Sequence, residues 1–197
     1  MKRYAFAITG ASGSVFGIRV LEHLFRSAEV HLIISSQSFP IIEHETGIDW
    51  SAATPSAVEK KIRLFFKSKR IFYHGESDLA SPLSSGSFLT DGMLVVPCSM
   101  KTLSGIACGY ANNLVERAAD VTIKERRQLL LSPREMPFSA IHLENMLKLA
   151  RLGVTIAPPV PAFYQRPTAL NEIIDFVAGK ILDSMGIGHE IFTRWGS

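Results

Sequence analysis

The sequence predicts an α/β fold, a three-layer α/β/α sandwich with a mainly parallel sheet of Rossmann or flavodoxin type. Short continuous apolar runs alternate with segments of helical periodicity along the chain. These runs lack the polar alternation of a half-exposed strand, which is typical of parallel strands buried on both faces. A chain of 197 residues, 47% hydrophobic and 20% charged, fits one folded unit, so we expect a single domain over residues 1–197.

The same patterns predict each element in turn. Six strands are expected, at residues 4–9, 29–34, 71–74, 92–97, 129–132 and 154–157. Six helices are expected, at residues 15–27, 39–45, 55–66, 114–127, 141–151 and 168–185. The segment 99–109 predicts either a short helix or a loop, and residues 75–87, rich in Ser, Gly and Pro, predict a loop. Ligands of such folds bind beyond the carboxyl ends of the strands, so residues that follow strands are the candidates for a site.

Composition argues against a disordered or membrane-spanning chain. The mean hydropathy of +0.18 is too high for disorder. No apolar run reaches the roughly 18 to 20 residues that a membrane-spanning helix needs. The apolar stretch near the N-terminus is too short for a secretory signal, so we expect a cytoplasmic protein.

The net charge and the cysteine and histidine content limit the kinds of ligand and partner that we expect. The net charge is +3, and the densest basic run, Lys124 to Arg127, contains an acid, which argues against a nucleic-acid partner. Two cysteines without a CxxC motif and six histidines without an HExxH motif argue against a structural metal or a disulfide. The excess positive charge fits a small anionic ligand better.

The first two strands end in residues suited to a nucleotide. Residues 10–13, Gly-Ala-Ser-Gly, lead into a helix, where a tight turn and free N–H groups attract phosphate. The spacing is only half of a dinucleotide fingerprint, so an ordinary glycine turn is the alternative. The second strand ends at Ser35 and Ser36, without the acid that usually binds the ribose of NAD. A hydroxyl there can donate to a phosphate or a ribityl chain, which favours FMN.

The strand at residues 92–97 is followed by another polar segment. Residues 99–102 carry hydroxyls and one lysine that suit the polar edge of a flat heterocycle, although a helix cap by Ser99 explains part of this pattern. Cys98 is expected to be a buried structural thiol rather than a nucleophile.

Two proline-containing segments follow the last two strands. Arg134 can bind a phosphate through two bonds and Glu135 can move a proton, with a surface ion pair as the alternative. Residues 158–167 contain four prolines and an aromatic pair, which predicts a pocket wall or a subunit contact.

These segments together resemble the UbiX-type flavin prenyltransferase family. The resemblance runs from the first strand to the last few residues, and it rests on the combination rather than on any single motif. The matching segments are Thr9-Gly-Ala-Ser-Gly13, Pro97-Cys-Ser99, Glu116-Arg-Ala-Ala-Asp120, Lys124-Glu-Arg-Arg127, Pro133-Arg-Glu135, His142-Leu-Glu-Asn-Met146, Pro161-Ala-Phe-Tyr164 and Arg194-Trp195.

The resemblance implies a reaction and its partners. A dimethylallyl group passes from dimethylallyl phosphate to N5 and C6 of reduced FMN without a metal. The prenylated FMN then serves UbiD-type decarboxylases, in ubiquinone biosynthesis or in aromatic acid decarboxylation. Members of the family commonly form homo-oligomers, usually dodecamers, with active sites at subunit contacts.

The resemblance also implies roles for individual positions. Contacts to FMN are implied for Gly10, Ala11, Ser12, Ser35, Ser99, Met100, Lys101, Thr102 and Arg134. Contacts to the prenyl phosphate are implied for Arg117, Lys124, Glu135, Tyr164 and Lys180. Catalytic roles are implied for Ser12, Glu45, Lys124, Glu135 and Trp195. We expect the cationic and aromatic members to gather at one edge of the sheet beside the flavin.

Two points in these assignments stay open. The residues do not divide the acid and base work between Glu45 and Glu135. Lys180 stands where many members of the family carry arginine, and lysine keeps the charge but lacks the planar fork that binds phosphate through two bonds. We therefore expect a retained but weaker phosphate contact at Lys180.

Two other classes of function compete with this interpretation. One is an FMN-dependent decarboxylase that acts directly on a 4-hydroxy-3-polyprenylbenzoate or on a cysteine-derived thiol. The other is a protein that stores FMN or serves as a scaffold without catalysis.

Overall fold

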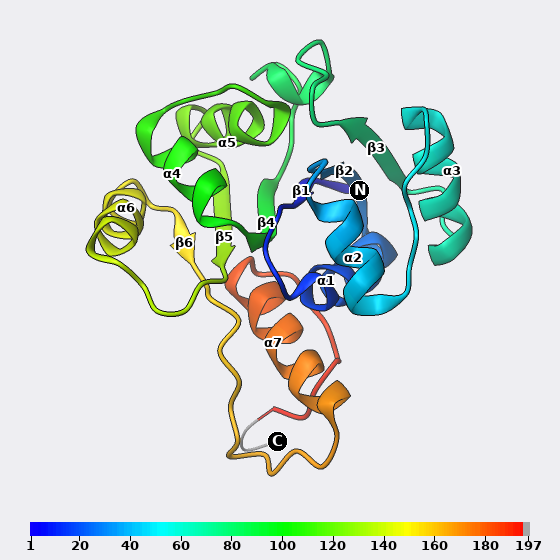
Figure 1. Ribbon diagram of the computed structural model, residues 1–197, viewed down its shortest axis with the longest axis vertical. Helices are drawn as coiled ribbons and strands as arrows, with labels where there is room; N and C mark the ends of the chain where they lie inside the picture. Colours follow the sequence, from blue (N-terminus) through cyan, green and yellow to red (C-terminus); the bar gives the residue numbers. More distant parts are fainter. Residues whose placement is uncertain (195–197) are drawn as a thin grey trace.

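Six parallel strands form the sheet of the computed structural model, which describes residues 1–194 (Figure 1). The strands are β1 (Lys2–Ile8), β2 (Ala28–Ile34), β3 (Ile71–Gly75), β4 (Gly92–Cys98), β5 (Gln128–Pro133) and β6 (Thr155–Ile156). Their order is β3-β2-β1-β4-β5-β6, and every neighbouring pair is parallel. This is the doubly wound Rossmann order, so the predicted fold class is confirmed.

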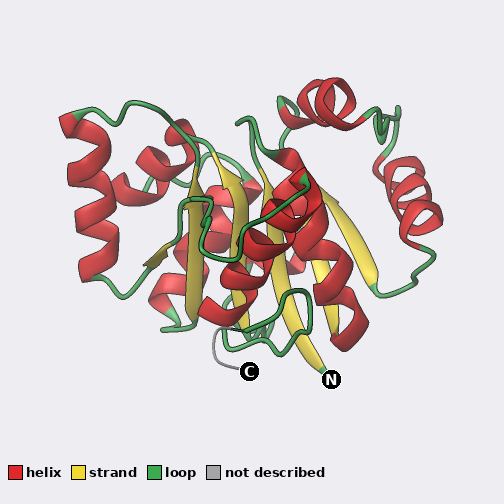
Figure 2. Ribbon diagram, turned by 90° about the horizontal axis from the view of Figure 1, so that it is seen from below, coloured by secondary structure: helices red, strands yellow, loops and turns green. Residues whose placement is uncertain are grey.

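Helices cover both faces of the sheet (Figure 2). One face carries α1 (Ser14–Ser27), α2 (Ser38–Thr46), α3 (Pro55–Phe66) and α7 (Leu170–Ser184). The other face carries α4 (Met100–Cys108), α5 (Leu114–Lys124) and α6 (Ala140–Arg151). Along β1, Phe6 and Ile8 enter the first core whereas Ala5 and Ala7 enter the second. A strand buried on both faces therefore needs an unbroken apolar run, as the sequence showed.

Most predicted boundaries differ from the structure by one to three residues, and three of these differences have a clear local cause. The helix predicted to 127 ends at Lys124, and the backbone leaves the helical region at Arg126, where φ is +56°. The helix predicted from 168 begins at Leu170, because Glu172 accepts the Thr168 N–H at 2.7 Å and forms a turn ahead of the helix. The last strand shortens to Thr155–Ile156, since prolines, which lack an N–H donor, follow Ala157.

Two segments with looser predictions are now defined. Within residues 99–109, Met100–Cys108 form helix α4, and its N-cap residue Ser99 accepts the Thr102 N–H at 3.2 Å. The predicted loop of residues 75–87 contains one short 3₁₀ helix, Pro82–Ser84. Across residues 1–194, none of the helices is long and apolar enough to cross a membrane.

A close approach of α1 to the sheet positions the site. A Cβ atom on Gly17 would collide with the carbonyl oxygen of Val96 in β4. Glycine therefore lets the first turns of α1 lie directly against β4. This contact holds the N-terminus of α1 beside the carboxyl ends of β1 and β4, where the strand order reverses.

Candidate functional site

The carboxyl ends of β1 and β4 are joined by hydrogen bonds through Thr9. Its N–H and its Oγ1 both donate to the carbonyl oxygen of Pro97, at 3.2 and 3.0 Å. Oγ1 of Thr9 also accepts the Ser99 N–H at 2.8 Å. Thr9 is almost fully buried, so these bonds form a rigid floor at the switch point. Sequence analysis assigned no role to Thr9, because its position at the end of an apolar run indicated only a strand.

A surface hollow of about 570 Å³ lies above this floor. We refer to it as the switch-point groove. The turn of residues 10–12 forms one side, α2 forms another, and Nε of Arg134 donates to the carbonyl oxygen of Ser12 at 3.1 Å. The lining residues are Gly10, Ala11, Ser12, Pro40, Ile41, His44, Glu45 and Arg134. Three segments that the sequence singled out separately therefore meet in one groove.

The helix N-terminus expected to attract phosphate already holds a carboxylate. Glu45 in α2 accepts the Gly13 N–H at 3.0 Å, and Oε2 also accepts the N–H and the Oγ–H of Ser14, at 2.9 and 2.7 Å. The expectation of free N–H groups at the start of α1 is therefore wrong for these two residues. Sequence analysis missed this contact because Gly13 and Glu45 lie 32 positions apart in the chain.

The surroundings of Glu45 keep it ionised. Partial burial opposes ionisation, but hydrogen bonds from the Ser12 and Ser14 hydroxyls and from the Gly13 and Ser14 N–H groups outweigh it and lower the pKa of Glu45. The positive end of the α1 dipole acts in the same direction. Glu45 is therefore suited to accept a proton rather than to donate one.

The hydroxyl of Ser35 is buried at the end of β2. Oγ of Ser38 donates its hydrogen to the carbonyl oxygen of Ile8 at 3.0 Å. Ser35 must then donate in the 2.8 Å bond between its Oγ and that of Ser38. The lone pairs of the Ser35 hydroxyl remain for a ligand. Toward a ligand Ser35 is therefore a hydrogen-bond acceptor, whereas the sequence predicted a donor. A ribityl hydroxyl fits this role better than a phosphate.

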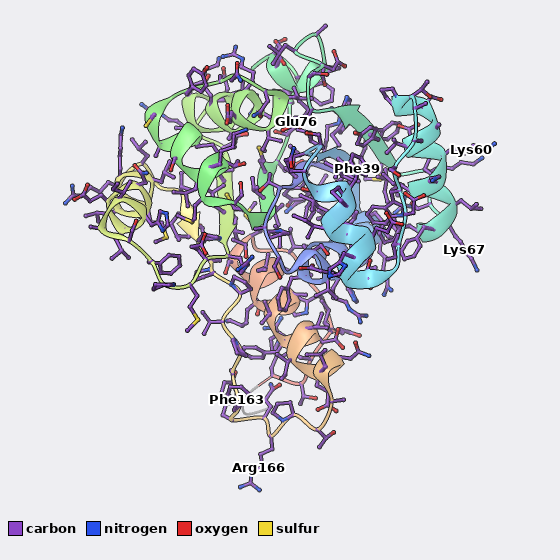
Figure 3. All side chains as sticks on the ribbon, in the orientation of Figure 1. Phe39, Lys60, Lys67, Glu76, Phe163 and Arg166 are labelled. Carbon is purple, nitrogen blue, oxygen red and sulfur yellow. The ribbon has the colours of Figure 1, made fainter. Side chains whose placement is uncertain are left out.

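An acid from β3 reaches the end of β2. Oε2 of Glu76, labelled in Figure 3, accepts the Ser36 N–H at 2.8 Å. The sequence correctly showed no acid directly after β2, but a neighbouring strand supplies one. Glu76 follows β3 in the chain, and the signal that could have identified it was the adjacency of β2 and β3 in the sheet.

The segment after β4 caps a helix, as one of its two interpretations predicted, and its contact with a flat heterocycle stays a prediction. Ser99 caps α4, and its Oγ also lies 3.0 Å from Oγ1 of Thr102. Met100 and Thr102 are buried, whereas Lys101 is exposed. Cys98 is fully buried, and burial raises the pKa of its thiol, so its assignment as a structural thiol is confirmed.

Glu135 is exposed next to the groove. Its Oε1 accepts the Met136 N–H at 3.1 Å, while the Arg134 guanidinium binds the turn at Ser12. Among residues 1–194, no ion pair joins Arg134 to Glu135, so the alternative of a surface pair between these two is wrong.

Tyr164 packs against α7, and Lys180 lies on that helix. The Tyr164 ring meets the Phe176 ring edge-on, with centroids 5.7 Å apart. Lys180 is exposed one turn after Phe176, with Nζ 3.9 Å from Oδ2 of Asp183. Trp195, to which the resemblance assigns a catalytic role, lies outside the described residues.

Lys124 is far from the switch-point groove along the strand direction. It ends α5, four residues before β5 begins at Gln128, so it lies at the amino edge of the parallel sheet. Its Nζ pairs with Glu125 at 2.7 Å. Arg117, earlier in α5, binds Asp120 at 2.8 Å. The expectation that all the cations gather at one edge of the sheet is wrong for Lys124 within one chain, because a crossover helix returns the chain to the opposite edge.

The fold and the groove define a doubly wound α/β protein with a hollow at the Rossmann switch point, where folds of this class bind nucleotides. The Flavoprotein family matches residues 1–191, and the chain belongs to this family. Within the described part of the chain, no group of three or more His, Cys, Asp or Glu residues is placed to hold a metal ion.

Three known proteins show how close the similarity is. The flavin prenyltransferase UbiX of Methanocaldococcus jannaschii is 50% identical over 190 residues, which cover 96% of each chain. The structure of a dodecameric FMN-dependent UbiX-like decarboxylase from Escherichia coli O157:H7 superposes with a TM-score of 0.88 and 44% identity, over 99% of this chain and 100% of that one. The structure of AnUbiX (PadA1) in complex with FMN and dimethylallyl pyrophosphate has a TM-score of 0.88 and 43% identity, over 100% of this chain and 98% of that one.

Proposed function

We propose that this chain is a flavin prenyltransferase, which transfers a dimethylallyl group from dimethylallyl phosphate to N5 and C6 of reduced FMN. The observation that carries the proposal is the near-full-length similarity to a protein named for this activity. The similar structure that contains FMN and dimethylallyl pyrophosphate supports the same pair of ligands. The reduced flavin supplies the two nucleophilic atoms, and the protein supplies binding, proton transfer and exclusion of water.

The switch-point groove fits FMN. The turn of residues 10–12 lets a flat ligand approach the backbone closely, and Ser35 offers an acceptor to a ribityl hydroxyl. Arg134 offers its guanidinium at the rim, and residues 99–102 border the end of β4 beside it. We assign the flavin to this groove.

Glu45 and Glu135 divide the proton transfers between them. Glu45 is held ionised at the N-terminus of α1, so it accepts the proton that leaves C6 and returns it to the allyl double bond as the ring closes, with the Ser12 hydroxyl beside it as a relay. The proton that leaves N5 balances the one that the departing phosphate gains. Glu135 is exposed next to the groove and donates to the departing phosphate. The sequence alone left this division open.

The departing phosphate requires cationic side chains, and the allyl group requires apolar surroundings that exclude water. A monophosphate gains charge as it leaves, and Arg117, Lys124 and Lys180 are the cations that we assign to it. An allylic cation reacts with water, so Tyr164 and Trp195 are assigned to shelter it with their aromatic faces.

The site is assembled from more than one chain. Lys124 lies at the amino edge of its own sheet, so it can complete only the groove of another copy. Met136 is 90% exposed beside Glu135, and Ile141, Leu143 and Leu147 expose apolar surface on α6. Such a surface is typical of a subunit interface. We propose a homo-oligomer, and the dodecamer of the similar decarboxylase is the assembly that we expect.

The mass of the flavin after reaction tests the proposed function against its alternatives. The protein is incubated with FMN, dithionite and dimethylallyl phosphate, and the extracted flavin is weighed by mass spectrometry, with a reaction lacking dimethylallyl phosphate as the control. We expect a gain of one prenyl group. Unchanged flavin mass, with carbon dioxide released from a 4-hydroxy-3-polyprenylbenzoate or from a cysteine-derived thiol, would instead indicate a direct decarboxylase. Unchanged flavin mass without any such release would favour the storage or scaffold role.

The fate of the product is also proposed. Prenylated FMN is a modified cofactor rather than an end product, so a decarboxylase of the UbiD type is the proposed recipient. The cytoplasmic location expected from the sequence stays a prediction.

A further inference from the structure

The chain after α7 folds back along that helix. It turns at Gly186, where φ is +63°, and residues 186–194, here named the C-terminal segment, run beside α7 toward its N-terminal end (Figure 1). Ile187 is buried, and Ile191 and Phe192 pack against the core. Near the end of the segment, the Thr193 carbonyl oxygen accepts from Nε2 of Gln165 at 2.7 Å. The segment therefore follows a defined path over the surface of α7.

A notch at Gly179 accommodates this path. A Cβ atom on Gly179 would lie 2.7 Å from Cε1 of His189 and would collide with the Phe192 ring. The Phe192 ring also packs on Phe176, with centroids 5.2 Å apart, and Phe176 in turn meets Tyr164 edge-on at 5.7 Å. The position of the C-terminal segment is thus linked by two ring contacts to Tyr164.

One carboxylate fastens the segment to the helix. Asp183 accepts two parallel hydrogen bonds from Arg194, Nη2 to Oδ1 at 2.8 Å and Nη1 to Oδ2 at 3.1 Å. Oδ1 also lies 3.1 Å from Nε2 of His189, whose side chain is buried. Two-pronged bonds between arginine and a carboxylate are among the strong ones, because both partners are charged and the geometry is planar.

Lys180 lies near the same carboxylate. Lys180 approaches Oδ2 only to 3.9 Å, and its side chain stays 57% exposed. Residues 191–194 border a cavity of about 610 Å³ at the N-terminal end of α7, which Arg166, labelled in Figure 3, also lines.

We propose that Asp183 is a positioning residue, which fixes the C-terminal segment on α7 and thereby orders Tyr164 for the prenyl donor. The proposal rests on the proposed function for its substrate. It adds a residue that touches neither ligand and acts through Arg194, Phe192 and Phe176.

The test is the variant Asp183→Asn in the full-length protein loaded with FMN. Hydrogen–deuterium exchange should become faster in residues 186–194 while the strands stay unchanged. Binding of dimethylallyl phosphate, measured by calorimetry without turnover, should weaken about tenfold, because a charge-assisted pair is lost. The affinity for FMN should stay within about twofold, since the switch-point groove is formed by other residues.

Two further variants keep the test decisive. Arg194→Gln removes the other partner without altering α7, so it should reproduce both changes even if Asp183→Asn folds poorly. Asp49→Asn removes an exposed pair of similar length, 2.8 Å to Lys61, and should change neither quantity. Asp183→Glu restores the carboxylate and should recover part of the affinity.

The possible outcomes test the role of Asp183 separately from the proposed prenyltransferase function. Unchanged exchange in both Asp183→Asn and Arg194→Gln would overturn the attachment of the segment. Faster exchange with unchanged affinity for dimethylallyl phosphate would overturn the positioning role. A wild-type protein that binds dimethylallyl phosphate but does not prenylate FMN would refute the proposed function while leaving the test of Asp183 intact.

Discussion

Acid should destabilise the fold through His74, which lies in a hydrogen-bond chain between β2 and β3. Its Nε2 lies 2.9 Å from Nδ1 of His31, and its Nδ1 lies 2.9 Å from Oγ of Ser81. Burial, with His31 alongside, lowers the pKa of His74 from 6.5 to about 4, although Asp78 and Glu59 act in the opposite direction. The folded protein therefore keeps this imidazole neutral at pH values where an exposed histidine is charged.

The magnitude follows from proton linkage. The unfolded chain binds the proton near pH 6.5, whereas the folded chain binds it only near pH 4. The stability that His74 contributes is thus present above pH 6.5 and is lost as the pH falls toward 4. Between about pH 7.5 and about pH 4.5 the free energy of unfolding should fall by about 2.5 kcal/mol through this group alone.

Urea unfolding, followed by circular dichroism at both pH values and at equal protein concentration, measures the effect. His74→Gln cannot titrate, so its stability should fall by about 2.5 kcal/mol less than that of the wild type over the same pH range. His44→Gln, at an exposed position on α2, is the matched control and should retain the full wild-type loss. If His74→Gln loses as much stability as the wild type, the linkage argument is wrong.

Three other predictions test the site and its support. Glu45→Gln and Lys124→Ala should each be inactive, but an equal mixture of the two, unfolded and refolded together, should regain about one quarter of wild-type activity. The reason is that about one site in four then receives its intact Glu45 from one chain and its intact Lys124 from another. No recovery of activity would place both residues of a site in one chain. Lys180→Ala should raise the apparent KM for dimethylallyl phosphate about tenfold in steady-state kinetics, and an unchanged KM would remove Lys180 from the phosphate site. Gly17→Ala should lower the free energy of unfolding by about 2 kcal/mol, because the new Cβ atom meets the backbone of β4. Urea unfolding measures the effect, and a variant as stable as the wild type would show that α1 can move away from β4 at no cost.

Local patterns were sufficient to predict the fold class. Continuous apolar runs such as residues 92–97 predicted buried parallel strands, and all six predicted strands are present. Errors fell at element ends, where a competing contact decided the boundary. Glu172, for example, holds the Thr168 N–H in a turn and delays the start of α7.

The candidate site was predictable only where its residues follow strands. Residues 10–12 and Arg134 meet in the groove because parallel strands end at the same edge of the sheet, and Ser35 follows the neighbouring strand at that edge. The contact between Glu45 and the start of α1 was not predictable, since it joins residues from two separate helices. Neither was the placement of Lys124, which depends on where a crossover helix returns.

By itself, the chain order of apolar runs, glycines and polar strand ends determined a doubly wound flavoprotein fold, because those features act over a few neighbouring residues. Only the tertiary structure decided which charges meet. It seated Glu45 on the amides of α1, bound Arg194 to Asp183 and placed Lys124 at the amino edge of the sheet, away from the switch-point groove. Charges pair according to the packing of whole helices, and that packing depends on contacts between residues far apart in the chain.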